Sequence, residues 1–258
     1  MVLQSKNLLV FAASGAIGQG VAREFAREGA HVWLSGRNEA ALAELAAQIR
    51  ADGGQATADV VDATEAEAVN RYVSRVAEMA GRIDGVFNAI GGRPTELGYP
   101  RPVAELPLDE FMLPLNLILG STYLTSRAAG LQMARQGGGS IITLSATLTG
   151  MALANMAGIT TVCGAIEALT RSLAGEFGSA GVRVNCVRGS AMPETRTIQE
   201  TMAGQIAITG QPPQMVMPPL GRPITVSDTA GAVTFLASDL SSGMTGQVIT
   251  VCAGAFVG

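Results

Sequence analysis

Short apolar runs alternate with amphipathic segments along almost the whole chain. Near the N-terminus the apolar run Leu8–Ala12 is followed by Ile17, Val21 and Phe25, which recur every four residues. The run is typical of a buried strand, and the spacing is typical of one face of a helix. Because this pairing recurs towards the C-terminus, the sequence predicts an α/β fold with a parallel sheet of about seven strands. Such a sheet is doubly wound, with helices on both faces.

The expected elements follow each other without a linker or a repeat, so we expect one domain over residues 1–258. The expected strands are Leu8–Ala12, Val32–Leu34, Ala56–Val60, Ile83–Ile90, Ser140–Ser145, Val182–Val187 and Gln247–Val251. The longest expected helices are Asp109–Gln136 and a second one that ends near Phe177, and a shorter helix is expected over Val226–Leu236. Two Pro- and Gly-containing stretches, Gly91–Pro107 and Gly189–Pro223, are expected to be irregular.

Composition excludes several classes of partner. The chain has 48% hydrophobic and 15% charged residues, a net charge of −4 and only one lysine, Lys6. A nucleic-acid partner is not expected, since phosphate binding requires a concentrated basic face. No metal site is expected either, because His31 is the only histidine and the three cysteines lack the spacing of a zinc site.

Two apolar segments could be mistaken for targeting or membrane sequences. Met1–Ala16 has the composition of a secretion signal, but an amphipathic helix follows it directly, which favours a first strand. Gln136–Ile166 carries no charge, yet its many Gly, Ser and Thr residues are unlike those of a spanning helix. We therefore expect no membrane partner and a cytoplasmic protein, in keeping with its widely spaced cysteines.

Six segments, in this order, resemble the short-chain dehydrogenase/reductase family. They read VAREFAREGAHVWLSGRN, ADVVDA, IDGVFNAIGG, GGGSIITLS, GVRVNCV and TGQVITV, and they extend over essentially the whole chain. The resemblance implies a Rossmann-type fold and an oxidoreductase that uses a nicotinamide cofactor. It also implies a homodimer or homotetramer formed through the two long helices.

The resemblance places a cofactor site at the first strand–helix turn, where glycines let the backbone approach a pyrophosphate. Here two of the family's three glycine positions hold Ala12 and Ala16, and only Gly18 is kept. The site is thus either an altered dinucleotide site or a turn without a ligand. Gly36 stands where NAD-binding members place an acid, and Arg37 follows it, which favours the 2′-phosphate of NADP(H). The implied cofactor contacts are Ser14, Gly15, Ile17, Gly18, Arg37, Asp59, Val60, Asn88 and Gly91.

The family's catalytic tetrad of Ser, Tyr, Lys and Asn has no counterpart in the sequence. The four positions align with Ala146, Ile159, Cys163 and Ile118. No alignment can restore a Tyr-x-x-x-Lys motif, because Lys6 is the only lysine. Asn116 is two residues from the Asn position, about 200° around a helix, and is expected to face elsewhere unless Pro114 distorts the turn.

Other residues beside the expected pocket could bind a ligand. Ser145, Thr147, Asn155 and Met192 lie there in the alignment. Strand-end or loop hydrogen bonding is the favoured explanation for the first three, and core packing explains Met192 at least as well. Glu194 and Tyr99 are candidates for an unconventional acid, with a surface role as the alternative.

Three functions stay open at this point. The first is an NADP(H)-linked oxidoreductase with unconventional proton transfer. The second is a non-redox enzyme or binder with an apolar pocket. The third is a catalytically silent subunit that assembles with an active relative.

Overall fold

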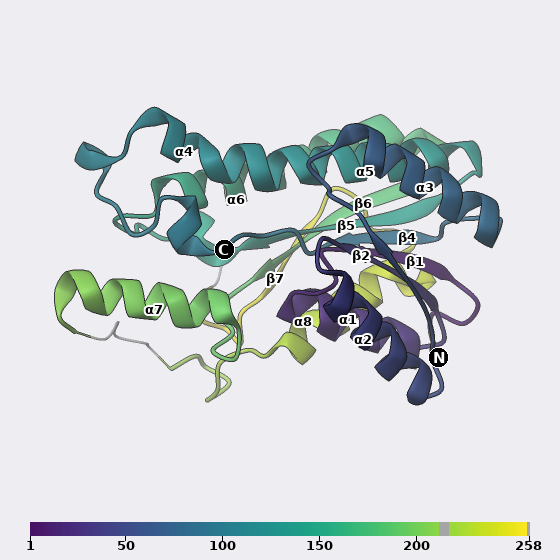
Figure 1. Cartoon of the computed structure of the whole chain (residues 1–258), viewed down its shortest axis with the longest axis horizontal. Helices are drawn as coiled ribbons and strands as arrows, with labels where there is room; N and C mark the ends of the chain where they lie inside the picture. Colours follow the sequence, from purple (N-terminus) through teal and green to yellow (C-terminus); the bar gives the residue numbers. More distant parts are fainter. Residues whose placement is uncertain (212–216, 257–258) are drawn as a thin grey trace.

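The computed structural model describes residues 1–211 and 217–256, which contain one seven-stranded sheet (Figure 1). The strands are β1 (Asn7–Phe11), β2 (His31–Gly36), β3 (Gln55–Val60), β4 (Gly85–Asn88), β5 (Gly139–Ala146), β6 (Val182–Gly189) and β7 (Val248–Val251). All neighbours pair in parallel, in the order β3-β2-β1-β4-β5-β6-β7. The predicted doubly wound, Rossmann-type α/β fold is therefore confirmed.

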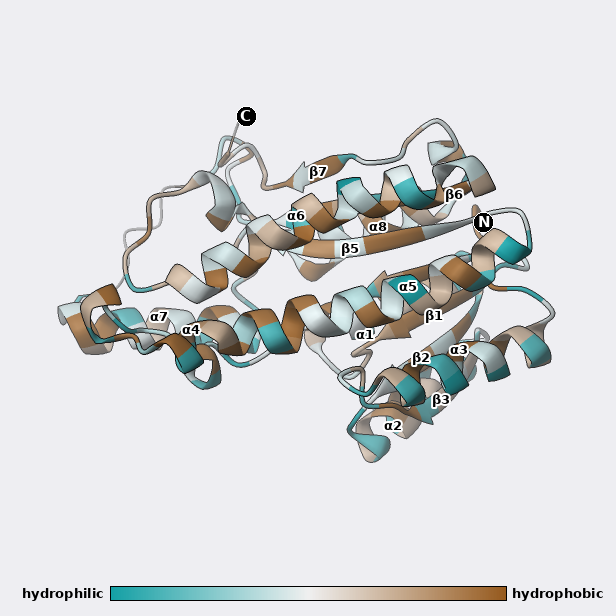
Figure 2. Cartoon of the chain, turned by 90° about the horizontal axis from the view of Figure 1, so that it is seen from above, coloured by the Kyte–Doolittle hydropathy of each residue, from teal (hydrophilic) through white to brown (hydrophobic). Residues whose placement is uncertain are grey.

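Helices cover both faces of this sheet (Figure 1). The α-helices of the described residues are α1 (Ala16–Arg27), α2 (Glu39–Ala51), α3 (Ala66–Ala80), α4 (Leu108–Pro114), α5 (Gly120–Arg135), α6 (Ala157–Phe177), α7 (Arg196–Thr209) and α8 (Val226–Ala237), of which α7 lies away from the sheet. Helices α1, α2 and α8 share one hydrophobic core with the sheet, and α3, α5 and α6 share the other. Figure 2 shows β1 and β5 as largely hydrophobic ribbons between these layers, as expected for strands buried on both faces.

The long helix expected over 109–136 is interrupted. Helix α4 ends at Pro114, a π-helical turn covers Leu115–Leu119, and α5 begins at Gly120. Proline has no amide hydrogen to donate and its ring crowds the preceding turn, so a local change of helical winding next to Pro114 is the expected result.

Helix α7 lies inside the stretch that was expected to be irregular, so that expectation was wrong. None of its residues is buried, and it ends at Gly210, whose φ of +71° is left-handed. Sequence periodicity reports the burial of one helix face. A helix without a buried face gives no such signal, and α7 was missed for that reason.

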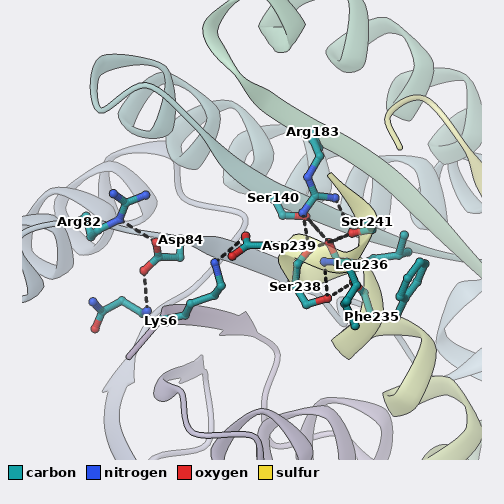
Figure 3. A network of polar contacts seen from close by, with 12 residues as sticks. Lys6, Arg82, Asp84, Ser140, Arg183, Phe235, Leu236, Ser238, Asp239 and Ser241 are labelled. Atoms are coloured by element: carbon teal, nitrogen blue, oxygen red, sulfur yellow. Dashed lines mark hydrogen bonds and ion pairs between the residues drawn. The ribbon is translucent and has the colours of Figure 1, made fainter. Parts of the chain in front are cut away.

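A polar network at the amino ends of the strands joins α8 to the sheet (Figure 3). The Arg183 guanidinium donates to the carbonyl oxygens of Leu236 at 2.9 Å and Ser238 at 3.1 Å. Lys6 Nζ lies 2.8 Å from Asp239 Oδ1. The only lysine of the sequence is therefore engaged at the edge of the sheet opposite to the carboxyl ends of the strands.

No helix within the described ranges combines the length and the hydropathy needed to cross a membrane.

Close contact between α5 and α6 gives a stability prediction. A Cβ on Gly130 would lie 2.4 Å from the Phe177 ring, so Gly130→Val should lower the free energy of unfolding by about 1–3 kcal/mol. Gly175 in α6 has open space around it, and Gly175→Ala should raise the free energy of unfolding by about 0.8–1 kcal/mol. Urea denaturation measures both changes, and equal effects of the two substitutions would contradict the packing argument.

Candidate active site

A large cleft opens at the carboxyl ends of the strands. The strand order reverses between β1 and β4, and the cleft lies at this reversal and extends over the ends of β5 and β6. Open parallel sheets bind their ligands at such a switch point. The cleft has a volume of about 1310 Å³.

Most of the residues that the sequence singled out line this cleft. They are Ser14, Gly15, Ile17, Gly18, Arg37, Gly91, Ile118, Ser145, Ala146, Thr147, Asn155, Ile159, Cys163 and Met192. Asp59, Val60 and Asn88 are not among the lining residues. The cleft has two halves. The nucleotide half surrounds the β1–α1 turn, and the substrate half is formed by β5, α6 and α7.

The N-terminus of α1 faces the nucleotide half, and no side chain caps its backbone amides. Gly15 is the N-cap, and the first turn contains no acidic residue. A Cβ at Gly18 would lie 2.6 Å from the Ala12 carbonyl oxygen, so this glycine is required for the contact between helix and turn. Free amides at a helix N-terminus form a binding site for an anionic group such as a phosphate.

Ala12 holds the turn in a conformation that usually requires glycine. Its φ is +55°, in the left-handed region. A Cβ there costs about 1–2 kcal/mol relative to glycine. The turn that the family builds with glycine is therefore kept in shape here, with backbone strain and an added methyl group.

The end of β2 supplies a cation, Arg37, that lines the same cleft as this turn. Gly36 is buried, and a Cβ there would meet Ser14 Oγ only at 3.6 Å, so the absence of a carboxylate is not forced by space. Arg37 is exposed and lines the cleft. Hydrogen bonds from Thr64 are the main cause of the lowered pKa of Asp62. The nearby Arg37 charge lowers the pKa of Asp62 further.

Three of the expected cofactor contacts lie elsewhere. Asp59 forms an ion pair with Arg75 of α3, and the Val60 side chain is 58% exposed outside the cleft. Strand β3 continues to Val60, opposite Gly36 of β2, so the chain reaches the cleft only afterwards. Residues 61–64 line the cleft instead, and the sequence analysis missed them. Of the two aspartates at 59 and 62, the structure places Asp62 in the cleft and Asp59 outside it.

Asn88 is buried and forms hydrogen bonds with α5. Its amide donates to Ser126 Oγ at 2.9 Å, and its carbonyl accepts from Thr125 Oγ1 at 2.8 Å. These bonds join the end of β4 to α5. In the same region, the buried Ser121 hydroxyl lines the cleft and has no hydrogen-bond partner among the described residues.

Apolar side chains occupy the substrate half where α5, β5 and α6 meet. Ile159 and Cys163 lie one turn apart on α6 and, with Ala146, line the cleft. Burial raises the pKa of the Cys163 thiol to about 11, outweighing its hydrogen bond with the Ala146 backbone. A thiol with such a pKa stays protonated near neutrality and is a poor nucleophile.

The π-helical turn does not bring Asn116 into the cleft. Ile118 and its neighbour Leu117 line the cleft, whereas Asn116 is exposed and is not a lining residue. The possibility that Pro114 rotates Asn116 towards the site is therefore excluded by the structure.

A buried ion pair lies directly behind the substrate half. Glu167 of α6 accepts from Arg188 Nε at 2.9 Å and Nη2 at 2.6 Å, from Ser145 Oγ at 2.9 Å and from Thr149 Oγ1 at 3.1 Å. The Arg188 guanidinium also lies over the Phe256 ring, 5.6 Å from its centroid. Burial by itself raises the pKa of Glu167, but these donors and the Arg188 charge together lower it below its ordinary value. The carboxylate is therefore ionised and orients Ser145.

The two candidate acids are both engaged in hydrogen bonds. Tyr99 lines the cleft, but its hydroxyl donates to the Thr201 carbonyl oxygen at 3.0 Å, which joins the loop after β4 to α7. Glu194 accepts from the Val226 amide at 2.6 Å and so stabilises the N-terminus of α8. No group of three or more potential ligands that could hold a metal ion occurs in the described part of the chain.

Comparisons with known proteins agree with this architecture. A family model described as enoyl-(acyl carrier protein) reductase matches residues 11–255. The chain is 31% identical to the 7α-hydroxysteroid dehydrogenase of Clostridium sardiniense over 258 residues, which cover 99% of this chain and 95% of that protein. The chain belongs to the short-chain dehydrogenase/reductase family.

Other members of the short-chain dehydrogenase/reductase family give the same picture. The L-rhamnose 1-dehydrogenase (NAD(P)(+)) of Azotobacter vinelandii is 31% identical over 262 residues, which cover 100% of this chain and 99% of that protein. The crystal structure of an NAD⁺-bound xylitol dehydrogenase superimposes with a TM-score of 0.90 and 29% identity, covering 98% of this chain and 100% of the other. Family membership makes this chain a relative of nicotinamide-dependent oxidoreductases.

The Glu167–Arg188 pair gives a prediction about stability. Arg188→Met leaves the buried carboxylate without its main partner and should lower the free energy of unfolding at pH 7 by about 3 kcal/mol. Glu167→Gln combined with Arg188→Met should recover part of this loss, because no unpaired charge then remains. Urea denaturation of the single and double variants measures both effects.

The control and the pH dependence make this test specific. Arg222→Met breaks the exposed pair with Asp228 and should have a much smaller effect. The lowered pKa of Glu167 stabilises the wild type above the ordinary value of 4.5, and this contribution is lost as the pH falls below it. The difference between wild type and Arg188→Met should therefore shrink in acid, and a constant difference would contradict the role of the charge.

Proposed function

We propose that the chain is an NADP(H)-linked oxidoreductase of its family that works without the family's side-chain proton donor. The observation that carries the cofactor part is the nucleotide half of the cleft. There, free amides at the N-terminus of α1 and the exposed Arg37 lie at one switch point, and Gly36 provides no competing carboxylate.

The residues of this half fit a dinucleotide phosphate. Residues 16–18 would hold the pyrophosphate through backbone amides, since the Gly15 amide already donates to the Ala12 carbonyl oxygen and Gly18 keeps the helix against the turn. Arg37 would bind the 2′-phosphate, a role for which a guanidinium is suited. When bound, the nicotinamide would supply or accept a hydride at the boundary with the substrate half. Relatives named for NAD⁺ or NAD(P)⁺ support the choice of cofactor class.

The proposal for the chemistry depends on which side chains line the substrate half. The family's Ser, Tyr, Lys and Asn positions correspond to Ala146, Ile159, Cys163 and Ile118, all of which line the cleft. The side chains of Ala146, Ile159 and Ile118 cannot transfer a proton, and the raised pKa of Cys163 makes its thiol a poor base and a weaker acid than an ordinary thiol. A proton would then come from water or from the substrate itself. Loss of one positioned acid or base costs about 10²–10⁴-fold in rate, so slow carbonyl reduction is expected.

Cofactor affinity is the first test. NADPH should bind the wild type more tightly than NADH does, and Arg37→Ala should weaken NADPH binding by about 10- to 100-fold, as expected for a hydrogen-bonded charge pair of about 1.5–3 kcal/mol. Gly36→Asp should reverse the preference towards NADH. Calorimetric titration measures these affinities, with both cofactors for the wild type and for Gly36→Asp.

Arg75→Ala is the matched control, because Arg75 is a nearby surface arginine that pairs with Asp59 outside the cleft. It should leave NADPH affinity unchanged. If NADPH did not bind even at millimolar concentration, the oxidoreductase proposal would fall, and the apolar binder and the silent subunit would be the functions left.

Restoring catalytic residues is the second test. Ile159→Tyr with Cys163→Lys should leave carbonyl reduction weak, because Ala146 still offers no hydroxyl and Ile118 no amide. Adding Ala146→Ser and Ile118→Asn should raise turnover by at least tenfold over the double variant. NADPH oxidation with a panel of ketones measures the rates. Robust turnover by the double variant alone would show that the Ser and Asn positions are misassigned.

A further inference from the structure

One wall of the substrate half is a segment that buries little of its own surface. It consists of residues 147–155, which follow β5 and are called the wall segment; all of them except Thr149 and Gly150 line the cleft. Residues 150–154 are exposed, and Met151 is 48% exposed. A segment with so few buried contacts of its own takes its position from the groups that pack behind it.

Thr149 and Gly150 make the contacts behind the wall segment. Thr149 Oγ1 donates to Glu167 Oε1 at 3.1 Å. A Cβ on Gly150 would overlap Cε2 and Cζ of Phe256, so the aromatic ring fills the space that a side chain at position 150 would need. Because the φ of Gly150 is not left-handed, its backbone would accept other residues, and it is the Phe256 ring that requires glycine here.

Phe256 is held from its other side by β6 and by the turn after β7. Its ring lies over the Arg188 guanidinium, which is 5.6 Å from the ring centroid, and its carbonyl oxygen accepts from Cys252 Sγ at 3.2 Å. Arg188 is bound in turn by Glu167, and the side chains of this ion pair are only 14% and 7% exposed. The ring therefore links a buried, fixed ion pair to the exposed wall segment.

We propose that Phe256 is a positioning residue that fixes the wall segment and thereby the shape of the substrate half. Phe256 does not line the cleft, so it acts on a ligand only through the wall segment. The size of ligand that the substrate half accepts is then set in part by a side chain that the ligand never touches. The inference rests on the proposed function in that the same cleft is the ligand site, but no nucleotide enters its test.

Hydrogen exchange of the full chain, followed by mass spectrometry, measures the mobility of the wall segment. In Phe256→Ala the amides of residues 147–155 should exchange about three- to tenfold faster, as expected from the loss of a cation–π contact and of ring packing. Peptides from β1 and α1 should be unchanged. Phe235→Ala is the matched control, because Phe235 is an exposed ring near the amino ends of the strands (Figure 3). An unchanged wall segment, or an equal increase throughout the chain, would overturn the proposal.

Cys163 reports the shape of the substrate half, because it lines the cleft and its thiol forms a hydrogen bond with the backbone of Ala146, directly before the wall segment. Its rates of reaction with N-ethylmaleimide and with the bulkier N-(1-pyrenyl)maleimide are compared. Tryptic digestion separates it from Cys186 and Cys252. In Phe256→Ala the ratio of the pyrenyl rate to the ethyl rate should rise by a similar factor, since a displaced wall admits the larger reagent. An unchanged ratio would overturn the proposal.

Gly150→Ala tests the same contact from the wall segment and leaves Phe256 in place. Its methyl group would overlap the ring, so this variant should also speed exchange of residues 147–155. In the double variant with Phe256→Ala, the methyl group enters the space that the ring has left. The two substitutions should therefore be less than additive in the logarithm of the exchange rate, and additive effects would overturn the proposal. Because none of these measurements contains a nucleotide, their failure is distinguishable from a failure of NADPH binding.

Discussion

Parallel pairing of β1 with both β2 and β4 determines where chemistry can occur in this protein. A parallel strand must be followed by a crossover, and the crossovers on the two sides of β1 leave towards opposite faces of the sheet. The helix N-termini and loops that follow the strands therefore surround one opening. The β1–α1 turn, the end of β2 and the residues after β5 all meet there, although they are far apart in the sequence.

The two halves of the opening have different physical characters. In the nucleotide half, backbone amides and the exposed Arg37 favour an anion, although the Asp62 carboxylate lies close to that arginine. In the substrate half, the side chains that line the cleft are mostly apolar, and the buried charges of Glu167 and Arg188 neutralise each other behind Ser145. Residues 146, 159 and 163 line the cleft from ordinary positions at the end of β5 and along α6.

Burial patterns explain what could be predicted from the sequence and what could not. The strands were predictable because β1, β2 and β4 are almost completely buried and read as continuous apolar runs. Helix α7 was not, because it has no buried face. Strand β3 ends at Val60, as its apolar run predicted, but the sequence pattern did not indicate that residues 61–64 after it line the cleft. The Glu167–Arg188 pair could not be inferred, because it joins α6 to β6 across residues without a shared periodicity.

The location of Lys6 has a practical consequence. Its ε-amine is the only lysine amine in the sequence and lies beside Asp239 at the amino edge of the sheet (Figure 3). A reagent that acylates primary amines would thus attach the molecule to a surface or a dye through Lys6 or through the α-amine of Met1, which lies 3.8 Å from Glu28 Oε2. Because Lys6 lies at the amino edge of the sheet, molecules immobilised through it would present the opening on the opposite side to the solution.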